Sequence, residues 1–492
     1  MNKKIFFIGI GGIGMSALAR FYKAKGFEVA GSDAEKTSIT EELISEGIDV
    51  KIGHCPENIT GNEEKIFYTE AISEKNIEFQ KAKKLKLNLK TYFEGVGEIS
   101  KKYKTIAVAG AHGKSTTTAM IAILLQELGL SPSCIVGTKV PNFGNKNFLV
   151  GDGEFLIVEA CEYRESFLDL EIFGEVILNI EAEHLDYYGT EEKYFEAFKK
   201  FYKKIPKNGF LIWNKNCKNS KKIFGEEEKK IKELEKKFIQ NEKNFEEGKK
   251  FLEKKITGIK GDLKKIPDFQ IPGNHIKFDV LCAVKAVEKI LLSMDRNEEN
   301  LKKIFKIFGE NKIREKHFFE GKKFFCGRGL KNKNFKILQK KFSGTWRRFE
   351  ILGKVGKSTI ISDYAHHPAE IIATLKSAKL KFPNQKIITI FEPHQYSRTI
   401  ELFDDFCKSF GDADLVIIPS IYKVRDKDED VKKMSPKQLA DGILEISGNS
   451  KFLDGYNETE KFLRENFEND ENILIFMGAG DIDNLARKFI GK

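Results

Sequence analysis

A short segment beginning at Gly110 has the composition and order of a phosphate-binding loop. It reads Gly-Ala-His-Gly-Lys-Ser, follows the apolar run Thr105–Ala109 and precedes a segment with helical spacing. In such a loop, backbone N–H groups surround phosphate oxygens, Lys114 neutralises their charge, and the Ser115 hydroxyl is available to Mg²⁺. The loop is shorter than the common phosphate-loop motif, because Val108 stands where that motif has its first glycine. We therefore expect this segment to bind the phosphates of a nucleotide.

Two later strand ends carry side chains that could form a metal site beside this loop. Glu159 ends the apolar run Phe155–Glu159, and His184 follows the strand-like run Glu175–Asn179. A carboxylate at a strand end next to a phosphate loop suits Mg²⁺, which prefers oxygen ligands. Imidazole is an unusual ligand for Mg²⁺. The residues alone therefore leave His184 either as a ligand or as a packed side chain close to the ligands.

A glycine-rich segment near the N-terminus has the pattern of a dinucleotide-binding loop. Gly9–Gly14 follows the apolar run Lys4–Ile8 and opens the helix-like segment Met15–Lys25, and Asp33 lies beyond a second strand, Glu28–Gly31. The glycines permit a tight turn and close approach of the backbone to a pyrophosphate, whose negative charge is favoured at a helix N-terminus. The motif predicts a diphosphate attached to a nucleoside, and it does not identify the nucleotide.

A third group of polar residues gathers near the C-terminus, in loops that follow predicted strands. These loops are Asp363–Pro368, Glu392–Arg398 and Gly478–Asp481, and the pair Arg347-Arg348 precedes them. Ligands of open α/β sheets bind at the carboxyl ends of the strands, so we expect a further binding site here. Arg398 follows His394 by four residues, a spacing that places two side chains on one face of a helix.

Strand-like and helix-like segments alternate along the chain, and this pattern predicts an α/β protein with parallel sheets. The 492 residues exceed what one core usually holds, and the pattern restarts twice. We therefore expect three domains, at residues 1–100, 101–343 and 344–492. Within the second, the Lys/Glu-rich stretch 218–265 is interpreted as a solvated helical excursion, and the basic, Phe-rich stretch 309–341 has no assignment.

The composition is that of a globular protein, with 41% hydrophobic and 32% charged residues. The net charge is +11, but lysines are interleaved with glutamates, so we expect a solvated surface and no nucleic-acid partner. No apolar run is long enough for a membrane span, and the N-terminus lacks the features of a secretory signal. The seven scattered cysteines include no CxxC pair, which argues against a disulfide scaffold and favours a reducing cytoplasm.

Taken together, the motifs resemble the Mur ligase family, the ATP-dependent amino-acid ligases of peptidoglycan precursor synthesis. The matching segments occur in the family's order and are Gly9–Ser16, Gly110–Thr117, Glu159–Leu168, Asn179–Asp186, Gly273–His275, Arg347–Glu350, Asp363–Glu370, Phe391–Thr399 and Gly478–Ile482. The resemblance covers nearly the whole chain. It implies a Rossmann-like N-terminal domain, a central P-loop ATPase-like domain and a Rossmann-like C-terminal domain.

The resemblance also implies roles for individual residues, with ATP and Mg²⁺ as cofactors. Catalytic roles fall on Lys114, Glu159, His184 and Arg348. ATP contacts fall on Gly110, His112, Gly113, Lys114, Ser115, Thr116, His275, Arg347 and Asp363. Contacts to a UDP-linked sugar fall on Gly11, Gly12, Gly14, Ser16, Asp33 and His54. The incoming amino acid meets Tyr364, His366, His394 and Arg398, and Mg²⁺ is ligated by Ser115, Glu159 and His184.

The activity that the resemblance implies is ATP-dependent ligation of L-alanine to the lactyl carboxylate of UDP-N-acetylmuramic acid through an acyl phosphate. Groups from separate domains would have to close around the acyl phosphate, which also keeps water away from it. A sister branch of the family attaches a recycled tripeptide to the same sugar nucleotide, and Glu162-Tyr163 are similar to its pattern. Asn179–Glu181 and Pro393–Arg398 favour the alanine branch.

Two alternatives from other functional classes stay open. A nicotinamide-dependent dehydrogenase would explain Gly9–Gly14 and Asp33, but it leaves the loop around Lys114 without a role. A catalytically inactive binding protein is suggested by Ile276 and Asp279, which stand where the family pattern has asparagines.

Overall fold

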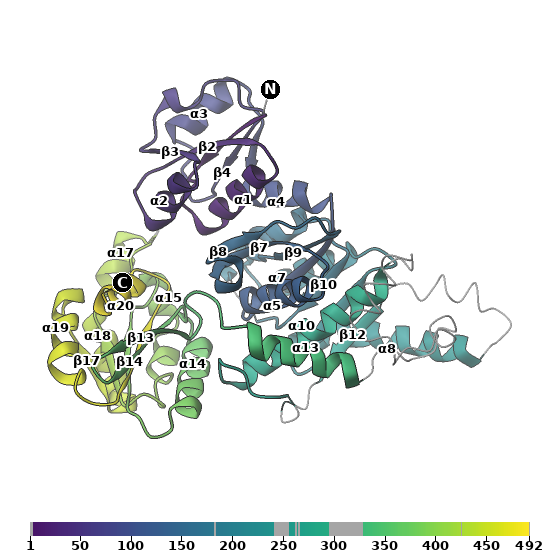
Figure 1. Cartoon of the computed structure of the whole chain (residues 1–492). Helices are drawn as coiled ribbons and strands as arrows, with labels where there is room; N and C mark the ends of the chain where they lie inside the picture. The colour runs from purple at the N-terminus through teal and green to yellow at the C-terminus, as the bar shows by residue number, and fades with distance from the viewer. Residues whose placement is uncertain are drawn as a thin grey trace. The chain divides into compact units, whose positions relative to one another are not determined.

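The computed structural model describes residues 3–181, 184–240, 255–260, 263, 266–294, 328–424 and 426–491. Within these residues the strands form three sheets, and helices connect most of the parallel strands (Figure 1). The chain divides into two compact units. The first consists of Met1–Pro267 with Phe278–Phe342, and the second of Asp268–Lys277 with Ser343–Lys492. The α/β architecture predicted from the sequence is confirmed, and the predicted domain limits at residues 100 and 343 stay predictions.

The first sheet lies near the N-terminus and is entirely parallel. Its strands are β1 (Lys4–Ile8), β2 (Glu28–Asp33), β3 (Asp49–Ile52), β4 (Lys65–Tyr68) and β5 (Leu89–Thr91), in the spatial order β3-β2-β1-β4-β5. The connecting helices are α1 (Ile13–Ala24), α2 (Ser38–Ser45), η1 (Pro56–Asn58) and α3 (Ile77–Lys84), and α4 (Tyr92–Ser100) follows β5. The strand order reverses between β1 and β4, which is where ligands bind in such sheets.

The second sheet has the order β12-β11-β10-β6-β9-β7-β8, and β8 is antiparallel to β7. Its strands are β6 (Lys104–Ala109), β7 (Ser133–Val140), β8 (Lys146–Leu149), β9 (Phe155–Glu159), β10 (Gly174–Ile177), β11 (Phe210–Asn214) and β12 (Lys255–Ile259). Its helices are α5 (Lys114–Glu127), η2 (Pro141–Phe143), η3 (Tyr163–Asp169), α6 (Leu185–Tyr188), α7 (Glu191–Lys203), α8 (Lys218–Gln240), α10 (Asn274–Ser293) and α13 (Arg328–Lys341). Since β6 is parallel to its neighbours β9 and β10, the loops that follow these three strands share one edge.

The interpretation of residues 218–265 as a solvated helical excursion is wrong in two respects. The segment does form the helix α8, but Phe224 of that helix is 1% exposed and belongs to the core. The segment also returns to the sheet, because β12 pairs in parallel with β11. A buried Glu228 explains part of this, since it pairs with Lys215 at 3.0 Å and accepts the backbone N–H of Gly258. Residues 241–254 and 309–327 lie outside the described residues, and α13 is the described part of the unassigned stretch.

The second unit is built on the third sheet. Its strands are β13 (Glu350–Val355), β14 (Ser358–Asp363), β15 (Ile387–Phe391), β16 (Leu415–Ile418), β17 (Ser450–Phe452) and β18 (Ile473–Met477), in the order β13-β14-β18-β15-β16-β17. The helices are α14 (Pro368–Lys381), α15 (Tyr396–Glu401), α16 (Phe403–Cys407), α17 (Asp428–Lys433), α18 (Pro436–Ser447), α19 (Gly455–Phe467) and α20 (Ile482–Phe489). The parallel strands β14, β18 and β15 are neighbours, so the polar loops after them meet at one edge.

Candidate active site

The phosphate loop runs from the end of β6 into the first turn of α5, which includes Ser115 and the buried Thr116. Gly110 and Gly113 have φ angles of 133° and 85°, a backbone region that favours glycine. The loop is held from the neighbouring strand: the N–H of His112 donates to Oδ1 of Asn179 at 3.0 Å, and Nδ2 of Asn179 donates back to the His112 carbonyl at 3.1 Å. The loop is therefore shaped by its neighbour as well as by its own glycines.

Lys114 lies folded over the loop that it follows. Its ammonium group donates to the carbonyl of Gly110 at 2.6 Å and lies 3.4 Å from Oε2 of Glu162, whose side chain is 1% exposed. His184 approaches the same carboxylate, with Nε2 at 3.8 Å from Oε1. Its ring packs on that of Tyr163 with centroids 4.7 Å apart. The structure thus gathers the predicted residues Lys114 and His184 around one buried acid that was not predicted.

Glu159 has the features of a cation ligand. Its Oε1 is buried and has no hydrogen-bond donor among the residues that the structure describes. A buried carboxylate oxygen without a partner is costly, so a bound cation would suit this position. No group of three or more His, Cys, Asp and Glu side chains in the described ranges is arranged to hold a metal ion. Mg²⁺ needs no such group, because it is commonly held by one or two carboxylates together with waters and substrate phosphates. The residues present fit Mg²⁺ in this way.

The two departures from the family pattern lie on α10 and differ in their surroundings. Ile276 is 5% exposed and forms part of the hydrophobic core. Asp279 lies against the phosphate loop, since a Cβ atom built on Gly113 would be 2.7 Å from its Oδ1. A side chain on Gly113 would therefore collide with Asp279, and glycine is required there for its packing as well as for its φ angle.

The glycine-rich loop of the first sheet is packed closely from two sides. The N–H of Gly11 donates to Oδ2 of Asp33 at 2.7 Å, and Gly12 is the N-cap of α1. A Cβ atom on Gly11 would lie 2.8 Å from Asp33, and one on Gly14 would lie 2.9 Å from the ring of Tyr92. The structure thus places Asp33 against the loop and explains why Gly11 and Gly14 have no side chain.

His54 follows β3 and is fixed at the same edge of the sheet by a fully buried acid, Glu78. The His54 Nδ1 atom is 2.8 Å from Oε2 of Glu78. The same carboxylate accepts hydrogen bonds from Ser32 Oγ at 2.5 Å, Asn58 Nδ2 at 2.6 Å and the N–H of Cys55 at 3.2 Å. Glu78 therefore holds the predicted sugar-nucleotide residue His54 in place.

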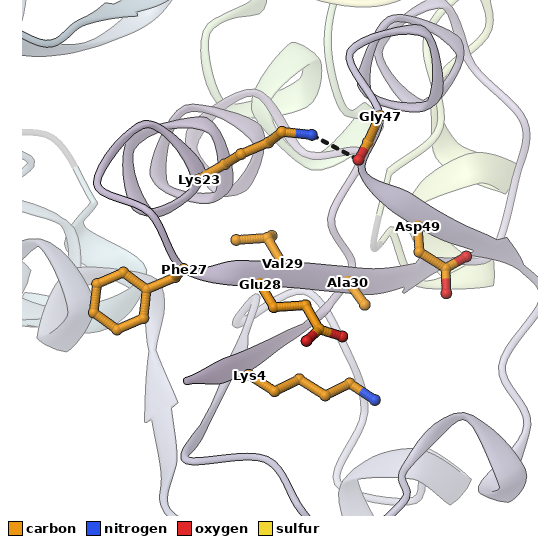
Figure 2. Close-up of a pocket in the computed structure, with 8 residues that line it drawn as sticks. All are labelled: Lys4, Lys23, Phe27, Glu28, Val29, Ala30, Gly47 and Asp49. Carbon is orange, nitrogen blue, oxygen red and sulfur yellow. Dashed lines mark hydrogen bonds between the residues drawn. The ribbon is translucent and has the colours of Figure 1, made fainter. Parts of the chain in front are cut away.

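A cavity of about 250 Å³ lies at the other end of this sheet (Figure 2). It is lined by Lys4, Lys23, Phe27, Glu28, Val29, Ala30, Gly47 and Asp49. Lys4 and Glu28 begin their strands, so the cavity is at the amino ends of β1 and β2, and Lys23 closes one side by donating to the Gly47 carbonyl at 2.6 Å. None of the predicted site residues lines it, and it does not mark the nucleotide site.

In the second unit, the residues predicted to bind an amino acid lie close together. The ring centroid of His366 lies 5.3 Å from that of Tyr364 and 6.1 Å from that of His394. The ring of His394 stacks on the ring of Tyr422, with centroids 5.5 Å apart. His394 precedes α15, so its closeness to Arg398 does not come from a shared helix face as the spacing suggested. Nδ1 of His394 is buried without a hydrogen-bond partner in the described part of the chain.

Both imidazoles in this cluster are neutral at physiological pH. Burial lowers the pKa of His366 to about 4, with Glu370 opposing the shift and Arg398 adding to it. Burial likewise lowers the pKa of His394 to about 4, and the positive charge of Arg398 adds to this shift. Arg398 is half-buried, and among the described residues no carboxylate forms an ion pair with it. The cluster therefore offers a cation and two neutral rings, which suits a ligand with a carboxylate.

Lowering the pH from about 7.5 to about 5 is expected to reduce the stability that His366 contributes. A histidine with a lowered pKa binds its proton more weakly in the folded state than in the unfolded state. The contribution of neutral His366 to the free energy of unfolding is therefore fully present above pH 6.5 and is lost as the pH falls toward 4. The loss by pH 5 is roughly 1–2 kcal/mol. Thermal unfolding should give a higher Tm for the wild type than for His366→Asn at about pH 7.5. The difference between the two Tm values should be smaller at about pH 5. A gap that stays constant would contradict the assigned neutral state.

The predicted ATP contacts of the second unit are firmly held by backbone groups. Arg347 is buried, and its Nη2 atom donates to the carbonyls of Gly478 and Gly480, the latter at 3.0 Å. Asp363, whose pKa is raised by burial, accepts the N–H groups of Phe349 at 2.7 Å and Ala365 at 2.8 Å. These contacts order the loops at this edge, and direct contacts of Arg347 and Asp363 with ATP stay predictions.

The two remaining predicted residues of this unit are more accessible. Arg348 is one-third exposed, with Nη1 at 3.4 Å from Oε1 of Glu370, and its guanidinium lies over the ring of Tyr364. His275 is exposed in the first turn of α10. Either side chain could therefore reach a bound ligand without unfolding its surroundings.

Three family models match successive parts of the chain. The Mur ligase family, catalytic domain, matches residues 4–104; the Mur ligase middle domain matches residues 108–287; and the Mur ligase, glutamate ligase domain, matches residues 347–480. A Clostridium kluyveri protein named UDP-N-acetylmuramate–L-alanine ligase is 35% identical over 497 residues, which cover 100% of this chain and 98% of the relative. The chain belongs to the Mur ligase family.

Other relatives agree with this assignment and with the fold. A protein of the same name from Caldanaerobacter subterraneus is 35% identical, over 99% of this Mur ligase and 97% of the relative. The solved structure of UDP-N-acetylmuramate-alanine ligase MurC from Thermotoga maritima has a TM-score of 0.71 at 24% identity, covering 99% of this chain and 98% of that one. A murein peptide ligase from Psychrobacter arcticus has a TM-score of 0.66 at 18% identity, with the same coverage. The Mur ligase architecture predicted from the motifs is confirmed.

Three residues of this Mur ligase belong to the candidate site although sequence reasoning did not assign them to it. Glu162 could have been found from its position three residues after Glu159, on the loop that leaves the same strand. Asn179 lies within a recognised motif, and its role in shaping the phosphate loop depends on β10 lying beside β6. Glu78 lies outside every motif, and no sequence signal pointed to it.

Proposed function

We propose that this Mur ligase joins L-alanine to the lactyl carboxylate of UDP-N-acetylmuramate at the expense of ATP, as a step of peptidoglycan precursor synthesis. The observation that carries the proposal is the identity of 35% over the full chain with proteins named for that reaction. The geometry agrees with it, because the phosphate loop, Lys114 and the unpartnered Glu159 oxygen are the parts that phosphoryl transfer requires. We place the reaction in the cytoplasm, since the six cysteines that the structure describes are free thiols.

The first step would activate the carboxylate. A lactyl carboxylate oxygen attacks the γ-phosphorus of ATP, the bond to the β-phosphate oxygen breaks, and an acyl phosphate and ADP result. Lys114 and the backbone N–H groups of the loop neutralise and orient the phosphates. Mg²⁺, when bound, supplies further charge neutralisation, and we assign its protein ligands to Ser115, Glu159 and His184. Glu162 pairs with Lys114 and lies 3.8 Å from Nε2 of His184, so its carboxylate is close to both side chains.

The second step would form the amide bond. The amine of L-alanine attacks the acyl carbon, the bond from that carbon to the phosphate oxygen breaks, and the departing phosphate takes up the proton that the nitrogen loses. Arg398 binds the alanine carboxylate, because a guanidinium matches a carboxylate with two parallel hydrogen bonds. The neutral ring of His394 can accept a hydrogen bond from the ammonium group, since its Nδ1 is buried and unpartnered in the described residues. Tyr364 and His366 complete this side of the site.

The sugar nucleotide would bind at the carboxyl edge of the first sheet. The support is the strand-order reversal beside Gly9–Gly14 and the packing of Asp33 onto that loop. We assign contacts to Gly11, Gly12, Gly14, Ser16 and His54 there. A nicotinamide cofactor would use the same kind of loop, but it would leave Lys114 and Glu159 without a function.

The test is ADP release by the purified protein with Mg²⁺, ATP, UDP-N-acetylmuramate and L-alanine. We expect sustained ADP release over many turnovers only when all components are present, together with a product whose mass is the sum of the two substrates less one water. Replacing L-alanine by the recycled tripeptide distinguishes the sister activity. Rapid turnover with the tripeptide and none with L-alanine would contradict the proposal. So would tight NAD binding in calorimetry without any binding of UDP-N-acetylmuramate.

A further inference from the structure

A buried polar network joins the glycine-rich loop of the first sheet to the hairpin β7–β8 of the second sheet, within one compact unit. Its centre is Asn147 of β8, which is 0% exposed. The Asn147 Nδ2 atom donates to the carbonyl of Ile13 and to Oγ of Ser16, the latter at 3.1 Å. Its Oδ1 atom accepts from Nη1 of Arg20 at 3.1 Å. All the hydrogen-bonding groups of this amide are therefore used across the junction.

Arg20 makes the network a specific one, because it is a buried cation and each of its three guanidinium nitrogens donates a hydrogen bond to a different residue. The residue is 2% exposed. Its Nε donates to Glu46 at 2.8 Å and its Nη2 to Glu42 at 3.1 Å, which leaves Nη1 for Asn147. Lys139 of β7 pairs with Glu42 in turn. A slip of α1 along the hairpin would break several of these contacts at once and would strand a buried charge.

The amide holds the part of α1 that matters for ligand binding. Ile13 is the first residue of the helix and Ser16 lies in its first turn, directly after the glycines. Ser16 Oγ also donates to the Ile13 carbonyl at 2.9 Å, so the two acceptors of Asn147 are linked to each other. The N–H groups of a first turn are the groups that bind a diphosphate. Their direction in this protein is set by a residue of the other sheet.

We propose that Asn147 is a positioning residue for the sugar nucleotide. It fixes the first turn of α1 relative to the sheet that carries Lys114, so that the diphosphate end of the acceptor and the phosphate loop share one rigid frame. The inference rests on the proposed function, because it takes the glycine-rich loop to bind that substrate. A displacement of this turn by about 1 Å would weaken substrate positioning substantially.

The variant Asn147→Asp tests this directly. It keeps the shape of the side chain and a partner for Arg20, but it replaces the amide donor by an oxygen that faces the Ile13 carbonyl. We expect KM for UDP-N-acetylmuramate to rise roughly 10-fold or more, with KM for ATP and for L-alanine within about 2-fold of the wild type. Calorimetric binding of UDP-N-acetylmuramate without ATP should weaken by a similar factor. Asn145→Asp is the matched control, since it makes the same substitution at an exposed residue between β7 and β8.

The outcomes separate a positioning role from a purely structural one. If Asn147→Asp lowers Tm while UDP-N-acetylmuramate binds as tightly as before, the network only stabilises the fold and the inference is wrong. Equal rises in all three KM values would also overturn it. Should Asn147→Asp not fold, Asn147→Ala, which leaves room for water, must show the same selective loss. A wild-type protein that does not bind UDP-N-acetylmuramate would overturn the proposed function and this inference together, whereas normal wild-type binding with an unaffected variant overturns the inference alone.

Discussion

Replacing Lys114 by alanine is expected to lower kcat on the order of 10³-fold while leaving the protein folded. Lys114 is the cation of the phosphate loop, and phosphoryl transfer depends chiefly on positioning and on neutralising phosphate charge. The substitution also removes the ion pair between Lys114 and Glu162, and the Glu162 carboxylate stays buried without it. Steady-state ADP release at saturating substrates gives kcat, and thermal unfolding checks the fold.

The matched control for this variant is Lys104→Ala, at the start of β6, the strand that leads into the phosphate loop. Lys104 begins β6 and pairs with Glu154 at 2.8 Å in a partly exposed position. An ion pair of that kind contributes about 0–1 kcal/mol and should leave kcat unchanged. If Lys114→Ala turned over at a rate close to that of the control, the loop from Gly110 would not be the triphosphate site.

Arg398→Lys is expected to raise KM for L-alanine roughly 10- to 100-fold and to leave KM for ATP nearly unchanged. A guanidinium presents two parallel donors to a carboxylate, whereas an ammonium group presents a point charge that is more strongly hydrated. The neutral His366 and His394 beside Arg398 provide no second cation to compensate. Initial rates with each substrate varied in turn measure the two KM values separately.

Arg464→Lys serves as the control for this second prediction. Arg464 lies on α19 in the same unit and pairs with Glu460 and Glu468, each at 2.9 Å, on the surface. Its replacement should change neither KM value. An L-alanine KM that stays at the wild-type value in Arg398→Lys would assign Arg398 to the surface and would leave the amino-acid site to be found elsewhere.

Most buried parallel strands could be predicted from the sequence, although β7 and β11 in the second sheet were missed, and edge strands could not be predicted. The predicted runs Lys4–Ile8 and Phe155–Glu159 coincide with β1 and β9, because strands covered on both faces need apolar residues at nearly every position. β12 and β17 were missed. They contain the polar segments Lys255–Ile259 and Ser450–Phe452 at the ends of their sheets, and pairing with a neighbour rather than local composition makes them strands.

The residues of the candidate site also fall into two groups, those that could be predicted from the sequence and those that could not. Residues that act within one contiguous segment, such as Gly110 and Lys114, could be predicted because their spacing alone encodes the loop. Glu78 and Asn147 could not, since their significance comes from partners distant in the chain. The contact between Arg20 and Asn147 joins residues separated by 127 positions. Only the folded arrangement of β8 beside α1 reveals it.

That separation has a consequence for how the protein is made. When the first sheet leaves the ribosome, Arg20 and the first turn of α1 have only water as partners on this side, because β8 has not yet been synthesised. The nascent N-terminal domain therefore completes its substrate loop late, only after the chain has grown from Thr91, the last residue of the first sheet, to Asn147 of β8. An exchange of N-terminal domains between family members would have to carry the hairpin β7–β8 along. A segment that can be exchanged with the network intact therefore ends after β8, and not at the end of the first sheet.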